Sequence, residues 1–331
     1  MRPGWNAAAT RGRLLLSRRL GPDRSRELSR AGWPEGRDLL AASGYGHYLP
    51  TGASPRQAGF AVRHTCLWNL RVLAGWAPPR GADVIRAVVA LLEIEAALDH
   101  LAALSVTQPP ARSATGSAAQ PATRPGAAEP LSADWYEPGQ LSTAWRAISS
   151  APDPEAFRSA LTGSVWRDPG AVDAASVTTT MGARWAVWVA ESVPGGHGWA
   201  QGYAALVAAR ALAGGRRWAD LPDGARSDLE VLLGRRLGEA DTWRALPELL
   251  PADSRWLLAG ITSTDQLWLA EGRWWARLQE DSAHALTTSR DGAAITGAAA
   301  ALLMEDAWRV EAALEAAQWG PAGAEVFDAV A

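Results

Sequence analysis

The chain has 331 residues and a formal net charge of −3, with 48% apolar and 20% charged residues. It contains no lysine, which excludes a phosphate-binding P-loop, a protein-kinase site and Schiff-base chemistry. The charge argues against a strongly basic nucleic-acid binder, and the single cysteine, Cys66, allows neither an internal disulfide nor a thiolate zinc site. Because Cys66 lies in an apolar helical context, we expect it in the core.

The first part of the chain carries only three consecutive leucines between arginines. A secretory signal needs an apolar stretch of roughly 7–15 residues, so we expect none here. The longest uncharged apolar tract, between Asp291 and Glu305, is well short of the ~20 residues that span a bilayer. We therefore expect a cytoplasmic protein that reaches a membrane only peripherally or through a partner.

The chain is expected to be all-α, because alanine and leucine are abundant and β-branched runs are short. Ser54 and Pro55 form a typical helix start, and this helix is predicted to run to Trp76. Its apolar stripe is expected to contain Ala61, Thr65, Trp68, Val72 and Trp76. A second long helix is predicted over 81–104.

The segment 107–130 is rich in proline, alanine, serine and threonine and has no large apolar side chain, so we expect a disordered insert. Helical patterns resume after it. Further helices are predicted near 139 and over about 154–163, 172–192, 199–217, 223–237, 242–250, 263–280 and 292–320. The predicted organisation is a first helical unit over 1–106, the insert over 107–130, and two more units over 131–240 and 241–331.

Two internal echoes suggest about three similar units. The first places an arginine late in a helix, at Arg71, Arg210 and Arg309. The second pairs 39–48 (LLAASGYGHY) with 157–166 (FRSALTGSVW), each a short helix that ends in a turn and an aromatic residue. Such echoes also arise by chance in a chain rich in alanine and arginine, so a true triplication stays open here.

Motifs that carry chemistry are scarce. The five histidines form no HExxH pair, and there is no GxSxG nucleophile motif. Glu95, Asp99 and His100 could form a metal-binding face, but such a cluster is more typical of a solvated helix. The glycine-rich segment 44–48 lacks the third glycine of a dinucleotide loop and is better interpreted as a tight turn between helices. We therefore expect no catalytic residue, cofactor or metal.

Tryptophan is unusually frequent, with 18 residues. Five of these tryptophans could line a ligand cavity, although tryptophan at helical spacing is more often part of the core. They are Trp185, Trp188, Trp268, Trp274 and Trp275. A terpenoid-type enzyme would also need clustered aspartates for magnesium, and the chain has no DDxxD motif.

The two ends of the chain differ in charge. The first thirty residues carry eight arginines, and the stretch from Glu305 onward carries six acidic residues against Arg309 alone. Such charges usually belong to solvated helix surfaces. They could instead form two docking surfaces for different partners.

From His47 to Leu101 the sequence resembles the C-type (in eukaryotes, d-type) central-stalk component of V-type and A-type ATPases, in its actinobacterial form. The motifs that carry the resemblance are YGH at 45–47, WNLRVLAGW at 68–76, RWWAR at 273–277, DAWRV at 306–310 and EVFDAVA at 325–331. The Asn-Leu-Arg element is intact at 69–71, whereas the asparagine is absent near Arg210 and Arg309.

The resemblance implies a funnel-like, all-helical, non-catalytic protein of about three similar units. It implies partners for proton or ion transport, namely the ATPase shaft subunits and the proteolipid ring at the inner face of the plasma membrane. Together with the echo, it implies structural or interface roles for Asn69, Arg71, Trp76, Arg210, Trp308 and Arg309. The alternatives are a divergent stand-alone helical scaffold without ATPase partners and a tryptophan-lined ligand binder.

Overall fold

The computed structural model describes residues 3–107, 135–240 and 242–329. Within these ranges the regular elements are helices and no strand occurs, which confirms the all-α prediction. The predicted insert at 107–130 lies outside the described residues apart from Thr107. The first three helices are α1 (Pro3–Leu16), α2 (Gly21–Arg30) and α3 (Glu35–Ala41). The sequence does not predict α1 and α2, because their arginine-rich segments have little apolar periodicity.

The longest helical hairpin is α4 (Pro55–Trp76) with α5 (Pro79–Thr107). The predicted start of α4 is confirmed by a capping box, in which the Ser54 hydroxyl accepts a hydrogen bond from the Gln57 backbone and the Gln57 side chain accepts one from the Ser54 backbone. Helix α5 begins at Pro79, earlier than predicted. The backbone N–H groups of the first turn have no partner within a helix, so proline, which has no N–H, can occupy this position.

The buried stripe of α4 differs from the prediction. Ala61 and Thr65 are buried as expected, but Trp68 is 47% exposed and Trp76 is 54% exposed. The core stripe instead follows Leu70 and Leu73 in the second half of the helix. Because 3.6 residues complete one turn, the buried face drifts away from the two tryptophans along this long helix.

The middle of the chain forms α6 (Trp145–Ser149), α7 (Pro154–Thr162), α8 (Ala174–Ser192), α9 (His197–Ala213) and α10 (Asp223–Leu233). Two of these helices end before their predicted limits. Helix α9 stops at Gly214, and Gly215 follows with a φ of 83°; helix α10 stops at Gly234, with a φ of 90°. Glycine adopts these backbone angles readily and so ends both helices.

The last part contains α11 (Leu246–Leu249), α12 (Leu267–Thr288), α13 (Gly292–Gln318) and α14 (Pro321–Asp328). The predicted helix over 242–250 was wrong in length, because Pro247 is tolerated only in a first turn and so confines α11 to a few residues. The predicted end near Gly320 is approximately correct. However, Pro321 also starts α14, which the sequence reasoning did not anticipate.

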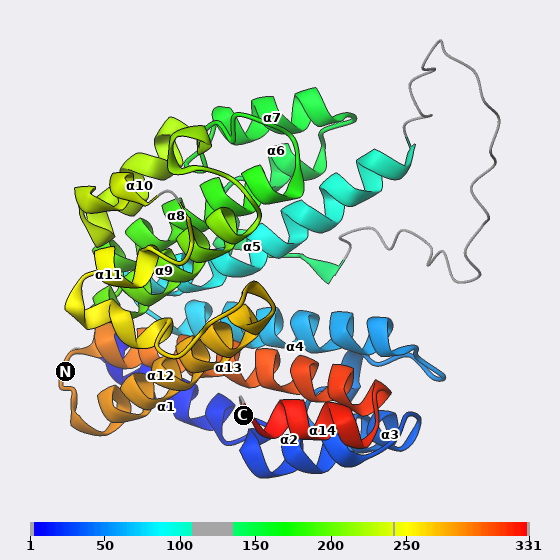
Figure 1. The fold of residues 1–331 in the computed structure, drawn as a ribbon. Helices are drawn as coiled ribbons and strands as arrows, with labels where there is room; N and C mark the ends of the chain where they lie inside the picture. The colour runs from blue at the N-terminus through cyan, green and yellow to red at the C-terminus, as the bar shows by residue number, and fades with distance from the viewer. Residues whose placement is uncertain (1–2, 108–134, 241, 330–331) are drawn as a thin grey trace.

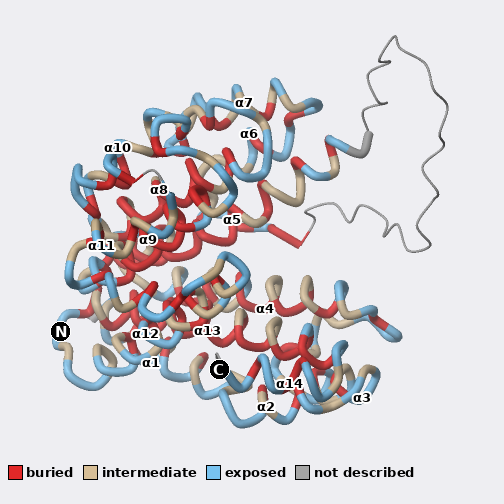
Figure 2. Tube along the Cα trace, viewed as in Figure 1, coloured by how far each residue is buried: buried red, intermediate tan, exposed pale blue. Residues whose placement is uncertain are grey.

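Six long helices form a closed circuit of contacts. In chain order, α4, α5, α8, α9, α12 and α13 each pack against the next, and α13 returns to α4 (Figure 1). Helix α13 also packs against α5, where Gly297 lets Val84 and Val193 approach its backbone. The buried positions concentrate on these inner helices, while α2, α3, α7 and α10 cover the outside (Figure 2).

A Ser-x-aromatic turn precedes the first helix of each long pair. It occurs at 43–45, 164–166 and 254–256. In each, the serine hydroxyl donates to a backbone carbonyl three residues earlier, at 2.6, 2.8 and 3.1 Å respectively. The backbone N–H of Tyr45 and that of Trp166 then each donate to the serine oxygen of their own turn at 3.1 Å.

The first two turns dock on long helices through buried carboxylates. The Tyr45 hydroxyl donates to Asp306 of α13 at 2.7 Å, and the Trp166 indole donates to Glu93 of α5 at 2.8 Å. Both carboxylates also accept backbone N–H groups of a nearby segment, at 20–21 for Asp306 and at 143–144 for Glu93. The echo between 39–48 and 157–166 therefore has a three-dimensional counterpart.

The third turn docks differently. The Trp256 indole donates to the Asp253 carbonyl of its own turn at 2.8 Å, and its ring lies against Gly202 of α9. It has no buried carboxylate partner among the described residues. The second and third turns thus rest on the last helix of the preceding pair, and the first rests on α13, the last helix of the circuit.

Candidate functional site

The six candidate residues occupy three places. Asn69, Arg71 and Trp76 lie on α4, partly or largely exposed, whereas Arg309 of α13 is buried. Arg210 and Trp308 lie at a groove formed by α12, α13 and α14. The three arginines of the first echo are not equivalent, because Arg71 lies on the first helix of its pair and Arg210 and Arg309 lie on the second. They do not form one site.

Arg309 is fixed inside the protein. It is 4% exposed, forms an ion pair with Glu305 one turn earlier, and donates to the Gln279 side chain at 2.7 Å. Burial raises the pKa of Glu305 to about 7, although the charges of Arg309 and Arg19 oppose the rise. This geometry fits a role inside the helical body and leaves Arg309 out of reach of a ligand on the surface.

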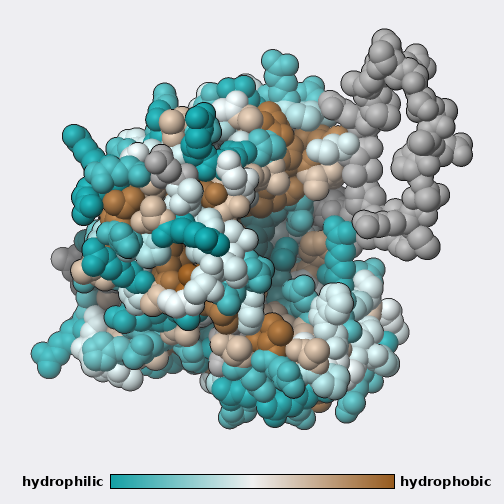
Figure 3. All heavy atoms as spheres, in the orientation of Figure 1, coloured by the Kyte–Doolittle hydropathy of each residue, from teal (hydrophilic) through white to brown (hydrophobic). Residues whose placement is uncertain are grey.

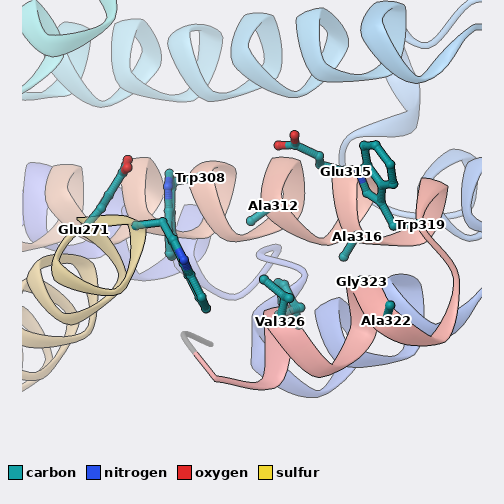
Figure 4. A pocket seen from close by; sticks show the side chains of 11 residues that line it. Glu271, Trp308, Ala312, Glu315, Ala316, Trp319, Ala322, Gly323 and Val326 are labelled. Atoms are coloured by element: carbon teal, nitrogen blue, oxygen red, sulfur yellow. The ribbon is translucent and has the colours of Figure 1, made fainter. Parts of the chain in front are cut away.

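The groove between α12, α13 and α14 has a volume of about 560 Å³. Its exposed apolar side chains are Trp268, Trp319 and Val326, with exposed fractions of 38%, 72% and 51%. Buried Ala316, Gly323 and Phe327 also line the groove, and Figure 4 shows Trp319 and Val326 beside the first two. Helix α14 approaches α13 closely because Gly323 has no side chain; a Cβ there would lie 2.2 Å from the Ala316 carbonyl oxygen. A large, exposed tryptophan beside such a groove is typical of a protein-binding surface.

Two carboxylates lie at the rim of this groove. Glu271 of α12 and Glu315 of α13 both extend towards the side on which α4 lies (Figure 4). Glu271 forms an ion pair with Arg210, and Trp308 stacks on Trp275 with ring centroids 5.4 Å apart. The rim is therefore acidic and aromatic, with Arg210 tied to one carboxylate.

A second group of acids lies where α4, α5 and α13 meet. The Arg63 guanidinium contacts Glu311 at 2.9 Å, Glu95 at 3.3 Å and Asp99 at 3.9 Å. The Arg63 guanidinium also lies 5.5 Å from the centre of the Trp135 ring, whose indole donates to Asp99 at 3.1 Å. One guanidinium thus serves three carboxylates, which leaves the cluster with an excess of negative charge when all are ionised.

The pKa values of this cluster reflect that excess. Burial raises the pKa of Glu95 and of Glu311; Arg63 opposes the rise, and neighbouring carboxylates add to it. The Glu271 carboxylate is among the neighbours that raise the pKa of Glu95, so the cluster and the groove rim share one electrostatic field. Figure 3 shows the molecule hollowed between the half with α5 to α10 and the half with α4 and α13.

The metal-binding alternative for α5 receives no support from the geometry. Arg63 lies among the carboxylates where a cation would sit, and the His100 ring faces the Ala151 carbonyl at 3.1 Å. Among the described residues, no group of three or more metal-ligating side chains is arranged for an ion.

The core interpretation is confirmed for most of the tryptophans and for the cysteine. Trp185, Trp274 and Trp275 are 2–6% exposed, and Cys66 is 1% exposed. Trp185 and Trp274 pack with Tyr203, and Trp275 packs with Trp274. Trp188 packs against the core, and Trp268 alone of the five is exposed at the groove.

A second surface of the molecule, on α1 and α4, is basic. We define the arginine face as Arg11, Arg13, Arg18 and Arg71 with Trp68 and Trp76, on α1, α4 and the turn after α1. The chain has no acidic residue between Asp38 and Asp83. The Arg71 guanidinium lies 5.7 Å from the Trp68 ring centre, and that of Arg11 lies 5.9 Å from the Trp76 ring centre. Both exposed tryptophans are therefore paired with cations, and the groove tryptophans have acids beside them.

Part of the charge at the chain ends is used internally. Arg30 of α2 pairs with Asp328 of α14 at 2.8 Å, and Arg19 lies 4.0 Å from Glu305. The basic N-terminal and acidic C-terminal helices thus hold each other.

Sequence reasoning missed Arg63, Glu311 and Trp319. The available signal for Trp319 was Gly320–Pro321, which ends one helix and starts another and so exposes the residue before it. The chain matches no protein-family model, and comparison with curated proteins finds no significant similarity. Within the described ranges, every helix is too short or too polar to cross a membrane.

Proposed function

We propose that this protein is a non-catalytic central-stalk component of a V-type or A-type ATPase that couples the proteolipid ring to the rotating shaft. The observation that carries the proposal is the presence of two surfaces of opposite charge, each with exposed tryptophans, on one closed set of helices. The resemblance of 47–101 and of the C-terminal motifs supplies the family. Such a protein does no bond chemistry and transmits force.

The acidic groove is the proposed contact with the shaft. Its carboxylates, Glu271 and Glu315, complement a basic helix, and Trp319 and Trp268 offer large apolar anchors. The excess negative charge around Arg63 extends this complementarity into the hollow. An amphipathic basic helix end of the shaft is therefore the proposed occupant.

The arginine face is the proposed contact with the ring. Its cations are suited to acidic cytoplasmic loops, and Trp68 and Trp76 can pack against apolar residues beside them. With this contact, we propose a peripheral position at the inner face of the plasma membrane. Asn69 and Arg71 then act at an interface, as their position in the Asn-Leu-Arg element implies.

The helical body is suited to carry load between the two contacts. Close-packed interiors resist deformation, and the circuit of six long helices has no free end. The three Ser-x-aromatic turns support an assembly of three similar units, which we propose to be the funnel of this family. Arg309 and Glu305 act within this body as a buried strut.

Co-purification from host membranes tests the proposal. Tagged protein from solubilised membranes should bring down shaft and proteolipid subunits, identified by mass spectrometry. The Trp319→Ala and Glu315→Arg variants should lose the shaft. Glu280→Arg, a charge reversal on the exposed part of α12 outside the groove, should retain it.

If the wild-type protein brings down no ATPase subunit from membranes, the central-stalk assignment fails. A reproducible complex with other proteins through the same groove would then support the stand-alone scaffold. A small molecule that remains bound through purification would support the ligand binder.

A further inference from the structure

Gly44 lets the turn after α3 lie against the residues that follow α1, and Gly46 lets the same turn fold back against the end of α3. A Cβ atom on Gly44 would lie 3.0 Å from the carbonyl oxygen of Arg18, and a Cβ atom on Gly46 would lie 2.1 Å from that of Ala41. A larger residue at Gly46 would therefore push the turn away. The close approach places His47 beside Arg18.

The pocket that results has a volume of about 290 Å³ and lies between the end of α1, this turn and α4. Its polar and aromatic walls come from Arg18, Arg19, His47, Tyr48, Trp68 and Asn69. None of the described residues that line it is acidic. The wall is therefore made of hydrogen-bond donors and aromatic faces, a composition suited to an anion.

Several donors of this pocket have no partner within the protein. Between described residues, no hydrogen bond uses the side chain of Arg18, His47 or Asn69, and His47 makes only an edge contact with the Tyr48 ring. Arg19 is partly engaged, since its Nε donates to the Leu16 carbonyl at 3.3 Å. Arg18 is thus a guanidinium with all its donors available.

The nearest acids do not neutralise this pocket. Glu305 is 4.0 Å from Arg19 but is already paired with Arg309. The two oxygens of Asp306 accept the Tyr45 hydroxyl and two backbone N–H groups at 20–21. Both carboxylates are buried, and no ion pair between described residues includes Arg18.

We propose that this pocket binds a phosphoryl group, carried by a soluble phosphate monoester or by an anionic lipid headgroup. Arg18 and Arg19 hold the phosphoryl oxygens, Asn69 and His47 donate further hydrogen bonds, and the exposed Trp68 ring covers the organic part of the ligand. The pocket shares Arg18, Trp68 and Asn69 with the proposed ring contact. Binding of a phosphoryl group by the isolated protein needs no ATPase partner, so its test does not depend on that contact.

Titration calorimetry on the full-length protein with glycerol 3-phosphate tests the shared chemistry. We expect saturable binding that Arg18→Gln and Asn69→Ala weaken at least tenfold. Arg24→Gln is the matched control, because Arg24 is an exposed arginine on α2 that lines none of the described pockets. It should leave the affinity unchanged.

Co-sedimentation with vesicles distinguishes the two sources. Binding to phosphatidate-containing vesicles but not to pure phosphatidylcholine vesicles, lost in Arg18→Gln and released by glycerol 3-phosphate, identifies a lipid headgroup. Binding of the soluble monoester without vesicle binding identifies a free ligand. The proposal is overturned if neither ligand binds, or if Arg24→Gln reduces binding as much as Arg18→Gln does.

Discussion

The acidic groove and the arginine face both display tryptophan, but they surround it with opposite charges. In the groove, Trp319 and Trp268 lie near Glu315 and Glu271. On the arginine face, guanidinium groups lie over the rings of Trp68 and Trp76. An exposed indole provides apolar area in either setting, so the surrounding charges decide which partner it accepts. Under the proposed function, this difference assigns the two surfaces to different partners.

The groove and the arginine face can be compared only in a folded protein. The largest expected effect therefore concerns the stability of the helical body. Trp166 is fully buried and bonded to Glu93, so Trp166→Ala should lower the free energy of unfolding by about 3–5 kcal/mol. Trp256 is partly exposed and has no carboxylate partner among the described residues, so Trp256→Ala should cost less than half as much. Denaturant titration followed by circular dichroism measures both. Equal losses of unfolding free energy in the two variants would show that the carboxylate contact of Trp166 adds no stability.

Glu305 lies between the two surfaces and should make the body sensitive to pH. Burial raises the pKa of Glu305 to about 7, so the folded protein holds this proton where an unfolded chain releases it. Its contribution to stability is therefore complete below the ordinary carboxyl pKa and is lost as the pH rises to about 7, by up to about 3 kcal/mol. Glu305→Gln should flatten this part of the profile of unfolding free energy against pH. An unchanged profile would show that Glu305 is ionised in the fold.

The groove and the arginine face should also respond differently to pH. Because the pKa values of Glu95 and Glu311 are raised, these carboxyls take up protons at a higher pH than ordinary ones. Affinity of the groove for a basic amphipathic peptide should therefore fall several-fold between pH 8 and pH 6, as measured by fluorescence anisotropy. The arginines of the arginine face stay charged over this range. If the peptide affinity is constant between pH 8 and pH 6, the Arg63 cluster does not contribute to peptide binding.

The smallest expected effect concerns Arg71, on the arginine face. Arg71→Ala removes the cation over Trp68 and should weaken co-purification of the ring a few-fold, with a change in unfolding free energy within about 0.5 kcal/mol. Arg309→Ala is the contrasting variant. It leaves Glu305 without its partner, so its effect on assembly should follow a loss of stability of about 3–5 kcal/mol. Normal ring capture by Arg71→Ala would remove this residue from the interface.

Much of the fold could be predicted from local patterns. The capped start at Ser54, the helix ends near Gly163 and Gly320, and the echo at 39–48 and 157–166 depend on neighbouring residues, and these were visible in the sequence. The ends at Gly214 and Gly234 were missed. The Arg63 cluster depends on α4, α5 and α13 meeting, which no local pattern encodes. The pairing of Arg30 with Asp328 likewise depends on the chain ends coming together. The arginine echo was visible in the sequence, but Arg71, Arg210 and Arg309 lie in unrelated environments in the structure. A shared residue type does not determine which helix face a residue occupies.

Photo-crosslinking in host membranes tests most directly whether the two surfaces engage different partners. A photoreactive phenylalanine analogue replaces Trp319 in one variant and Trp76 in another, and the crosslinked proteins are identified by mass spectrometry. We predict that the Trp319 position captures a shaft subunit and that the Trp76 position captures a ring subunit. Capture of the same protein from both positions, or of no ATPase subunit from either, would contradict the account.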